Sequence, residues 1–252
     1  MNQKLIAIDL DGTTLNANSE LTQETIDTLH AVQKLGHKVA IVTGRPYRSS
    51  KEIYNQLNLG GPIVNFNGAL CHIPSKPEWD GRYHITLDTE LVLDLVAFNK
   101  TLPVDYLMVE GTELMYSNIT ELPDCPYYPK DQKPLLIHPT TKLKEKPTAV
   151  ALFSDLELQS EIKKKILHRY NNGIEVRTWG GSYPCLEVIT SGIHKAKAVE
   201  HLSRYYDIHQ KDILAFGDED NDMEMIQYAG LGVAMGNAAN HIKELADVTT
   251  TT

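Results

Sequence analysis

Short apolar runs alternate with amphipathic stretches over the first third of the chain. Residues 4–8 and 38–42 are mostly apolar and β-prone, as is typical of buried strands. Between them, Thr22 is a candidate helix N-cap and Gly36 a candidate stop. Apolar residues recur there at helical spacing, at Ile26, Leu29, Val32 and Leu35. This order predicts a β-α-β unit with parallel strands and a right-handed crossover.

The same alternation continues with a helix over residues 47–57 and a strand over 63–66. Asn67-Gly68 then predicts a two-residue hairpin turn, after which the chain returns antiparallel. Asn67 is interpreted as a turn residue first and as a site residue second. Further strands are predicted near the carboxyl end of the chain, over 212–216 and 231–235.

The middle of the chain differs in its pattern of apolar and polar residues. Residues 75–82 are polar and interrupted by Pro and Gly, which predicts a domain boundary near Tyr83. Beyond it we expect helices over 88–102 and 155–170, strands over 105–110, 113–117, 148–153, 174–179 and 185–190, and a Pro-rich loop over 123–147. The order favours an α+β insert built on an antiparallel sheet. The predicted fold class is α/β, with a core domain formed by residues 1–82 and 189–252 and an inserted domain over 83–188.

Two acids stand at the end of the first predicted strand. Asp9 and Asp11 are spaced i, i+2, so on extended backbone both side chains point to the same side. In open parallel sheets the ligand crevice lies at the carboxyl ends of the strands. Two like charges this close repel each other, and a divalent cation such as Mg²⁺ would relieve the repulsion. The alternative is an ordinary Asp-Gly turn with acids in solvent.

Polar groups also follow the other predicted core strands. Thr43-Gly44-Arg45 offers a hydroxyl and a backbone N–H to a phosphate oxygen, unless it is only a strand-to-helix turn. Lys195 lies at a predicted helix start, where a cation is unfavourable unless an anion is near; Lys197 is the rival candidate. Residues 217–222 place four acids at another helix start, and an acid directly at a strand end is not explained by the helix dipole alone.

Composition narrows the class of protein. The chain has 252 residues, 42% hydrophobic and 23% charged, which is an ordinary globular balance. Its net charge of −9 disfavours nucleic acid and anionic membranes as partners. Cys71, Cys125 and Cys185 are widely spaced and form no Cys-x-x-Cys, so neither a zinc site nor a disulfide framework is indicated. With no signal peptide and no membrane-spanning run, the expected location is the cytoplasm.

The order of these motifs resembles the haloacid dehalogenase (HAD) superfamily of phosphohydrolases, in its Cof-type, C2-capped sugar-phosphatase branch (subfamily IIB). Residues 9–13 resemble its first motif, 43–45 its second, Lys195 its third and 217–222 its fourth. The resemblance covers essentially the whole chain. It implies a Rossmann-like parallel-sheet core with an inserted cap of the C2 type, which in that branch covers the active site and supplies substrate contacts.

The resemblance also implies roles for single residues. Asp9 would be the nucleophile, Asp11 the general acid and base, and Lys195 the cation that neutralises nucleophile and phosphate. Mg²⁺ would be held by Asp9, the main-chain carbonyl of Asp11 and Asp218. Asp222 would bind the metal directly or would contact one of its ligands. The phosphoryl group would be bound by Leu10, Thr43, Gly44, Arg45, Lys195 and Asn221.

The function predicted on this basis is a Mg²⁺-dependent phosphatase. It would hydrolyse small phosphorylated metabolites through an aspartyl-phosphate intermediate, and sugar phosphates are the expected substrate class. A phosphotransferase or phosphomutase on the same scaffold, or a non-catalytic phosphate-binding regulatory module, are the alternatives. The expected partner is a small phosphorylated metabolite, with no nucleic acid and no membrane, and the protein is expected to be a monomer or homodimer. A last helix is expected to start at 236–238, and the further helix usual in relatives is expected to be short or absent.

Overall fold

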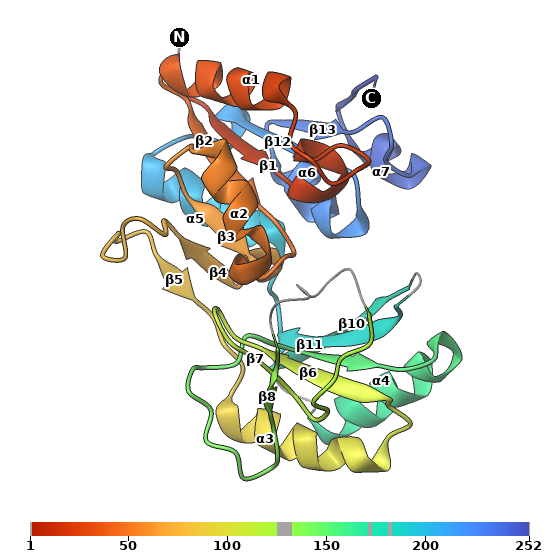
Figure 1. Ribbon diagram of the computed structural model, residues 1–252. Helices are drawn as coiled ribbons and strands as arrows, with labels where there is room; N and C mark the ends of the chain where they lie inside the picture. The colour runs from red at the N-terminus through yellow and green to blue at the C-terminus, as the bar shows by residue number, and fades with distance from the viewer. Residues whose placement is uncertain (1, 125–132, 171–172, 181–182, 252) are drawn as a thin grey trace. The chain divides into compact units, whose positions relative to one another are not determined.

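The computed structural model describes residues 2–124, 133–170, 173–180 and 183–251 (Figure 1). Its internal contacts divide the chain into two compact units. The first unit comprises Met1–Arg45, Ser50–His84 and Ile193–Thr252, and the second comprises Pro46–Ser49 and Ile85–Gly192. The fold is α/β, and the first unit contains a predominantly parallel sheet, as the sequence predicted.

The sheet of the first unit has the strand order β14-β13-β12-β1-β2-β3-β4-β5. Its strands are β1 (Leu5–Ile8), β2 (Lys38–Val42), β3 (Ile63–Asn65), β4 (Leu70–His72), β5 (Tyr83–His84), β12 (Ile213–Gly217), β13 (Leu231–Ala234) and β14 (Val248–Thr249). Pairing is parallel from β14 through β3 and antiparallel for β4 and β5. β1 lies between β12 and β2, which is why all of its residues are buried and apolar.

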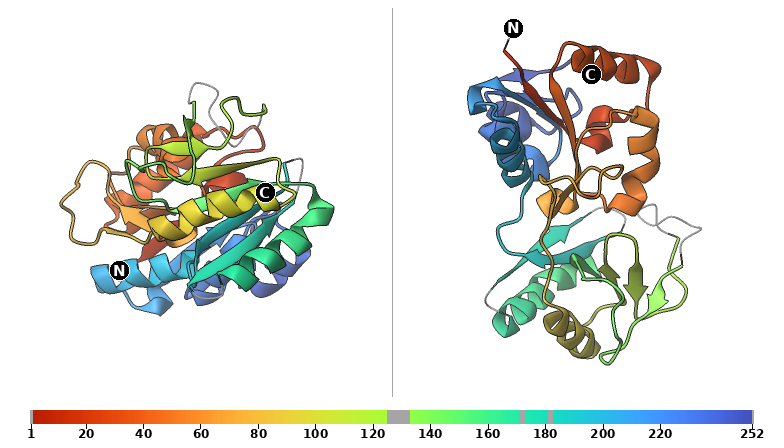
Figure 2. Two further views of the ribbon diagram at one scale, coloured as in Figure 1. Left: turned by 90° about the horizontal axis from the view of Figure 1, so that it is seen from below. Right: turned by 90° about the vertical axis from the view of Figure 1, so that its left-hand side faces the viewer.

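Helices cover both faces of this sheet. They are α1 (Gln23–Lys34), α2 (Tyr47–Leu57), α5 (Lys195–Tyr206), α6 (Met223–Tyr228) and α7 (Asn240–Leu245). Figure 2 shows α1 and α2 on one face and α5 and α6 on the other. The strand order runs from β1 to β3 in one direction and from β1 through β12 to β13 in the other. Because crossovers between parallel strands are almost always right-handed, this reversal favours helices on opposite faces of the sheet.

Local signals at α1 match the prediction. Thr22 caps the helix, and its side chain accepts a hydrogen bond of 3.1 Å from the Thr25 backbone N–H. Gly36 follows the helix with φ of 89°, a conformation that glycine adopts at no steric cost.

Two predictions in the first unit were wrong. The connection between β3 and β4 is not a two-residue turn, because Asn65 pairs with Leu70 and four residues lie between them. The last helix starts at Asn240 rather than at 236–238, where a turn lies instead. That turn is closed by a 3.0 Å hydrogen bond from the Ala238 N–H to the Met235 carbonyl oxygen.

The second unit contains a sheet of order β10-β11-β9-β6-β7-β8. The strands are β6 (Tyr106–Glu110), β7 (Met115–Ser117), β8 (Leu135–Leu136), β9 (Ala149–Phe153), β10 (Ile174–Trp179) and β11 (Cys185–Thr190). All pairs are antiparallel except β7 with β8. β8 lies inside the stretch predicted as a loop, and the part of that stretch over 125–132 lies outside the described residues.

Helices α3 (Thr89–Phe98) and α4 (Gln159–Arg169) pack on one face of this second sheet (Figure 1). The core between helices and sheet includes Leu95, Ile162, Leu107 and Val188, each with no exposed surface. Each unit therefore has a hydrophobic core of its own. Among the described residues, no helix combines the length and the apolar character needed to cross a membrane.

Candidate active site

The ends of neighbouring strands bring the acidic and basic candidates together within the first unit. Asp9 follows β1, and its N–H donates to the Phe216 carbonyl oxygen at 3.1 Å, so the ladder between β1 and β12 holds it. Asp218 directly follows β12. Lys195 is the first residue of α5. These side chains come from strand ends and a helix start far apart in sequence and meet at the carboxyl edge of the sheet.

Lys195 lies between two carboxylates and has no exposed surface. Its Nζ atom is 2.6 Å from Asp9 Oδ1 and 2.6 Å from Asp222 Oδ1. The other oxygen of Asp222 accepts from the backbone N–H groups of Asp218 at 3.1 Å and Glu219 at 3.2 Å. Asp222 therefore fixes both the lysine and the loop after β12. Two carboxylates explain why a cation stands at the positive end of a helix dipole.

The electrostatics of this cluster leave negative charge uncompensated. Burial raises the pKa of Asp9 to about 7, even though Lys195 lowers it, and Asp222 adds to the rise. Burial also raises the pKa of Asp218 to about 6, against a hydrogen bond from Thr13 that lowers it. Burial lowers the pKa of Lys195, but Asp9 and Asp222 outweigh it and raise that pKa above its usual range. The ammonium alone does not neutralise the carboxylates around it.

The donor set fits a hard divalent cation. Asp9, Asp218 and Asp222 are all buried, and each offers a carboxylate oxygen within 4.8 Å of the others. Carboxylate oxygens are the ligands that Mg²⁺ prefers. Gly12 makes room for the Asp218 carboxylate, because a Cβ atom at residue 12 would lie 2.1 Å from Asp218 Oδ2. The same residue has φ of 71°, which favours glycine.

The Asp11 side chain lies outside this carboxylate cluster. It forms an ion pair with Arg45, in which the Arg45 Nε donates to Asp11 Oδ2 at 2.7 Å and a terminal guanidinium nitrogen donates to Asp11 Oδ1. The hydrogen bonds to Asp11 raise the pKa of Arg45. Two acids predicted from their spacing thus have different partners: the buried Asp9 contacts Lys195, and the exposed Asp11 contacts Arg45.

A set of hydrogen-bonding groups lies beside the carboxylates. Thr43 is fully buried after β2, and its hydroxyl accepts from the Arg45 N–H at 3.1 Å. Gly44 comes so close to its neighbours that an added Cβ would lie 3.1 Å from Asn67 Oδ1 and 3.4 Å from Asn221 Nδ2. The Asn221 amide donates to Asn67 Oδ1 at 2.9 Å. Leu10 is fully buried at the start of the turn over Leu10–Thr14.

Sequence reasoning missed two residues that hold the site, Thr13 and Asn237, and it ranked a third, Asn67, as a site residue only in second place. Thr13 Oγ1 donates to Asp218 Oδ1 at 3.0 Å, and Asn237 Nδ2 donates to Asp218 Oδ2 at 2.9 Å. Asn67, which we predicted as a turn residue first and a site residue second, contacts Asn221. Asn237 follows β13 by a few residues, so the signal that identified Asp9 and Asp218, a polar residue near a strand end, was present there as well.

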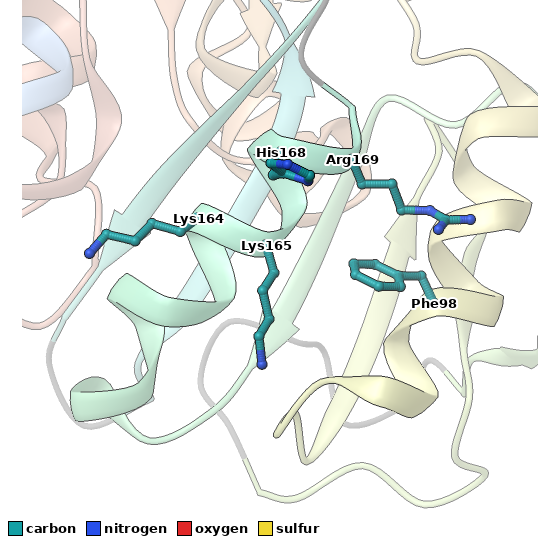
Figure 3. A pocket seen from close by; sticks show the side chains of 5 residues that line it. All are labelled: Phe98, Lys164, Lys165, His168 and Arg169. Carbon is teal, nitrogen blue, oxygen red and sulfur yellow. The ribbon is translucent and has the colours of Figure 1, made fainter.

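One hollow of about 570 Å³ lies elsewhere, on the helical face of the second unit (Figure 3). It is lined by Phe98, Lys164, Lys165, His168 and Arg169, from α3 and α4. Two of these cations have acidic partners: Arg169 pairs with Asp94, and Lys165 with Glu161. The hollow contains no carboxylate among its lining residues and does not include any of the residues predicted for the chemistry.

Comparison with known proteins agrees with this arrangement. The sequence profile of the haloacid dehalogenase-like hydrolases matches residues 6–252. The chain is 36% identical over 249 residues to a 5-amino-6-(5-phospho-D-ribitylamino)uracil phosphatase of Bacillus subtilis, covering 98% of this chain and 92% of that protein. It is 27% identical over 260 residues to an HMP-PP phosphatase of Yersinia pestis, covering 96% and 86% of the two chains.

Solved structures share the fold. A haloacid dehalogenase-like hydrolase from Bacteroides thetaiotaomicron superposes with a TM-score of 0.82 at 24% identity, covering 99% of this chain and 94% of that one. The HAD subclass IIB sugar phosphatase BT4131 superposes with a TM-score of 0.77 at 24% identity, covering 98% and 93%. The resemblance inferred from the motifs is thereby confirmed. The chain belongs to the haloacid dehalogenase-like hydrolase family, whose relatives named here are phosphatases.

Proposed function

We propose that this chain is a Mg²⁺-dependent phosphatase that hydrolyses small phosphate monoesters through an aspartyl-phosphate on Asp9. The observation that carries the proposal is the position of Asp9. Its carboxylate is buried, lies 2.6 Å from the Lys195 ammonium and shares a cluster with Asp218. A carboxylate held in this way beside a cation site has the features of a nucleophile for phosphoryl transfer.

The cation would be held by the carboxylates of Asp9 and Asp218 and by the main-chain carbonyl of Asp11. Asp222 is less suited as a direct ligand, because its oxygens already accept hydrogen bonds from Lys195, Asp218 and Glu219. When bound, the cation supplies positive charge that offsets the repulsion between the nucleophile and the phosphate.

The remaining chemistry is assigned to side chains of the first unit. Asp9 attacks phosphorus in line, a bond forms from its carboxylate oxygen, and the bond from phosphorus to the leaving oxygen breaks. Lys195 stabilises the negative charge shared by nucleophile and phosphoryl group. With Arg45 bound to the phosphoryl group instead of to Asp11, Asp11 in its protonated form gives its proton to the leaving oxygen and then regains one from the water that cleaves the aspartyl-phosphate. That water returns Asp9 to the carboxylate and releases inorganic phosphate.

The phosphoryl oxygens need donors at fixed positions. We assign this role to the Thr43 hydroxyl, the N–H groups of Leu10 and Gly44, the Asn221 amide and Arg45. Burial of Thr43 and Leu10 and the close approach at Gly44 support the assignment, since rigidly held donors stabilise developing charge without reorganisation. The Arg45 guanidinium also holds Asp11 beside this set.

The relative of highest identity reported above provides a first substrate. It is named for a phosphorylated ribitylaminouracil and matches 98% of this chain. We propose that compound, together with sugar phosphates, as the first to be tested. We also propose that residues 83–188 form a cap that selects among substrates, as caps do in the branch that the motifs resemble.

The test measures inorganic phosphate released from p-nitrophenyl phosphate with Mg²⁺ and then from a panel of phosphorylated metabolites. We expect Mg²⁺-dependent turnover that falls to background in Asp9→Asn, because the amide is a far weaker nucleophile. Asp220→Asn, at an exposed acid in the loop after β12, is the matched control and should keep activity. Absence of turnover by the unaltered protein on the whole panel, or full activity of Asp9→Asn, would reject the proposal.

A further inference from the structure

The geometry points to Asn67 as a positioning residue for the phosphate subsite, acting through Asn221. The inference rests on the proposed function, because it assigns Asn221 to the phosphoryl group. Asn67 is not only a turn residue between β3 and β4. Its side chain holds the Asn221 amide in place, and its backbone holds the end of β2.

The backbone at this point is in an unusual conformation. Phe66, Asn67 and Gly68 have φ of 52°, 55° and 111°, so three successive residues lie in the left-handed region. Asn and Gly tolerate this region, but a bulky residue such as Phe66 rarely adopts it. Such conformations persist where the surrounding structure determines them, and they gather at functional sites.

Main-chain hydrogen bonds fasten this turn to the end of β2. The Asn67 N–H donates to the Thr43 carbonyl oxygen at 3.1 Å, and the Phe66 N–H donates to the Arg45 carbonyl oxygen at 3.3 Å. The side chain of Asn65 donates to the same Arg45 oxygen at 2.9 Å. The turn and the Thr43–Arg45 segment therefore form one rigid piece.

The Asn67 side chain connects this piece to the loop after β12. It is 2% exposed, and its Oδ1 atom accepts a hydrogen bond of 2.9 Å from Asn221 Nδ2. An amide NH₂ group has two hydrogens, so this bond leaves the second one to donate to a phosphoryl oxygen. Gly44 permits the arrangement, because a Cβ there would press against both amides. The orientation of the Asn221 donor thus depends on Asn67.

The alternative role, a turn residue only, makes a different prediction. Glycine adopts positive φ without steric cost, so Asn67→Gly would preserve a simple turn. In the positioning role the same substitution removes the acceptor that orients Asn221. Asn58 provides a matched control, because it also has positive φ, of 47°, but lies exposed after α2 and away from the residues of the site.

The experiment compares Asn67→Gly, Asn221→Ala, the double variant and Asn58→Gly. Calorimetry measures the binding of inorganic phosphate in the presence of Mg²⁺. Steady-state kinetics with p-nitrophenyl phosphate give kcat/KM, and thermal unfolding gives Tm. We expect Asn67→Gly to weaken phosphate binding and to lower kcat/KM by about 10-fold, as the loss of one oriented hydrogen bond does. The double variant should be no worse than Asn221→Ala, and Asn58→Gly should match the unaltered protein.

The outcomes separate this inference from the proposed function. Phosphate binding and kcat/KM unchanged in Asn67→Gly, or losses in the two single variants that add in the double variant, would overturn the role of Asn67 and leave the phosphatase proposal intact. Weaker phosphate binding in Asn67→Gly from a protein that hydrolyses no ester would support the role of Asn67 and reject the phosphatase. A loss confined to Tm would return Asn67 to a purely structural role.

Discussion

Lys195 is fully buried, and its ammonium contacts Asp9 and Asp222 at equal distances of 2.6 Å. Taking such charges out of water costs free energy, which is recovered only while all partners are present. Removal of the ammonium would leave two buried carboxylates facing each other. The residue therefore has a structural role in addition to the proposed chemical one.

We predict that Lys195→Met abolishes phosphatase activity and destabilises the fold by about 3–5 kcal/mol, as expected when one partner of a buried ion pair is removed. Phosphate release and urea denaturation measure the two effects. The control is Lys197→Met, because Lys197 lies on the same helix but is exposed. It should keep activity and change stability by no more than about 0.5 kcal/mol. If activity is lost in Lys197→Met and kept in Lys195→Met, then Lys197 and not Lys195 is the lysine that the proposed chemistry uses.

Some residues of the candidate site were predictable from the sequence and others were not. Asp9, Thr43 and Asp218 follow apolar strands, and Lys195 stands where a cation is otherwise unfavourable, so each has a local signal. Asn67 had a local signal as well, but for a turn, and its contact with Asn221 is between residues 154 positions apart. A single sequence carries no sign of such a contact.

At the scale of elements, the hairpin of β3 and β4 carries a buried polar chain toward the site. His72 Nε2 lies 3.2 Å from Asn65 Oδ1, and Asn65 Nδ2 donates to the Arg45 carbonyl oxygen. His72 is 8% exposed, and Asn65 is fully buried. Burial, with further contributions from Arg82 and His84, lowers the pKa of His72 to about 4 from its ordinary 6.5. The hairpin therefore contains a histidine that stays neutral at physiological pH.

This pKa gives the fold a defined response to acid. Between about pH 6.5 and pH 4 the unfolded chain binds a proton at His72 that the folded chain does not, so the contribution of His72 to stability is fully present above this window and is lost as the pH drops through it. The raised pKa values of Asp9 and Asp218 act in the opposite direction, so the effect of His72 is read as a difference between variants. On going from pH 7 to pH 5, we predict that the free energy of unfolding of the unaltered protein changes less favourably than that of His72→Gln by an amount on the order of 2 kcal/mol. Urea denaturation at both pH values measures the difference.

The exposed His209 gives the matched control for this effect. His209→Gln should show the same change in stability between pH 7 and pH 5 as the unaltered protein. Equal changes in the unaltered protein and in His72→Gln would mean that His72 keeps its ordinary pKa in the folded state.

Long, strongly patterned elements were predicted well, and irregular ones were not. The strands over 174–179 and 185–190 match β10 and β11, because apolar residues alternate or cluster along them. β8 has only two residues, both exposed, and it is a strand because β7 pairs with it. The β3–β4 connection depends on positive φ at Phe66, a conformation that the residue type does not favour.

On the scale of the whole molecule, the net charge of −9 and the acidic cluster favour binding of cations. All the residues proposed to hold Mg²⁺ belong to the first unit. A ligand that binds only the folded chain stabilises it in proportion to the logarithm of its concentration. The buried carboxylates should therefore make the fold depend on divalent cations.

We predict that Mg²⁺ at about 100 times its Kd stabilises the protein by about 2.7 kcal/mol and raises Tm by roughly 5–10 °C. EDTA should reverse the increase. Asp218→Asn should abolish it, because the variant removes one of the proposed ligands, whereas Asp220→Asn should retain it. Thermal unfolding with and without Mg²⁺ gives the measurement. A Tm that does not respond to Mg²⁺, or a full response in Asp218→Asn, contradicts the assignment of the cation site.

The central place of β1 in its sheet has a consequence for how the protein is made. One neighbour of β1 is β12, and the hydrogen bond from Lys4 to Asp212 beside this pair joins residues 208 positions apart. On the ribosome, β1 therefore emerges long before β12 has been translated. The second unit, which ends at Gly192, is translated completely in the interval between these two strands. Asp9, the proposed nucleophile, gains Lys195 only after the second unit has been translated, so under the proposed function a nascent chain that lacks residue 195 cannot act on phosphate esters.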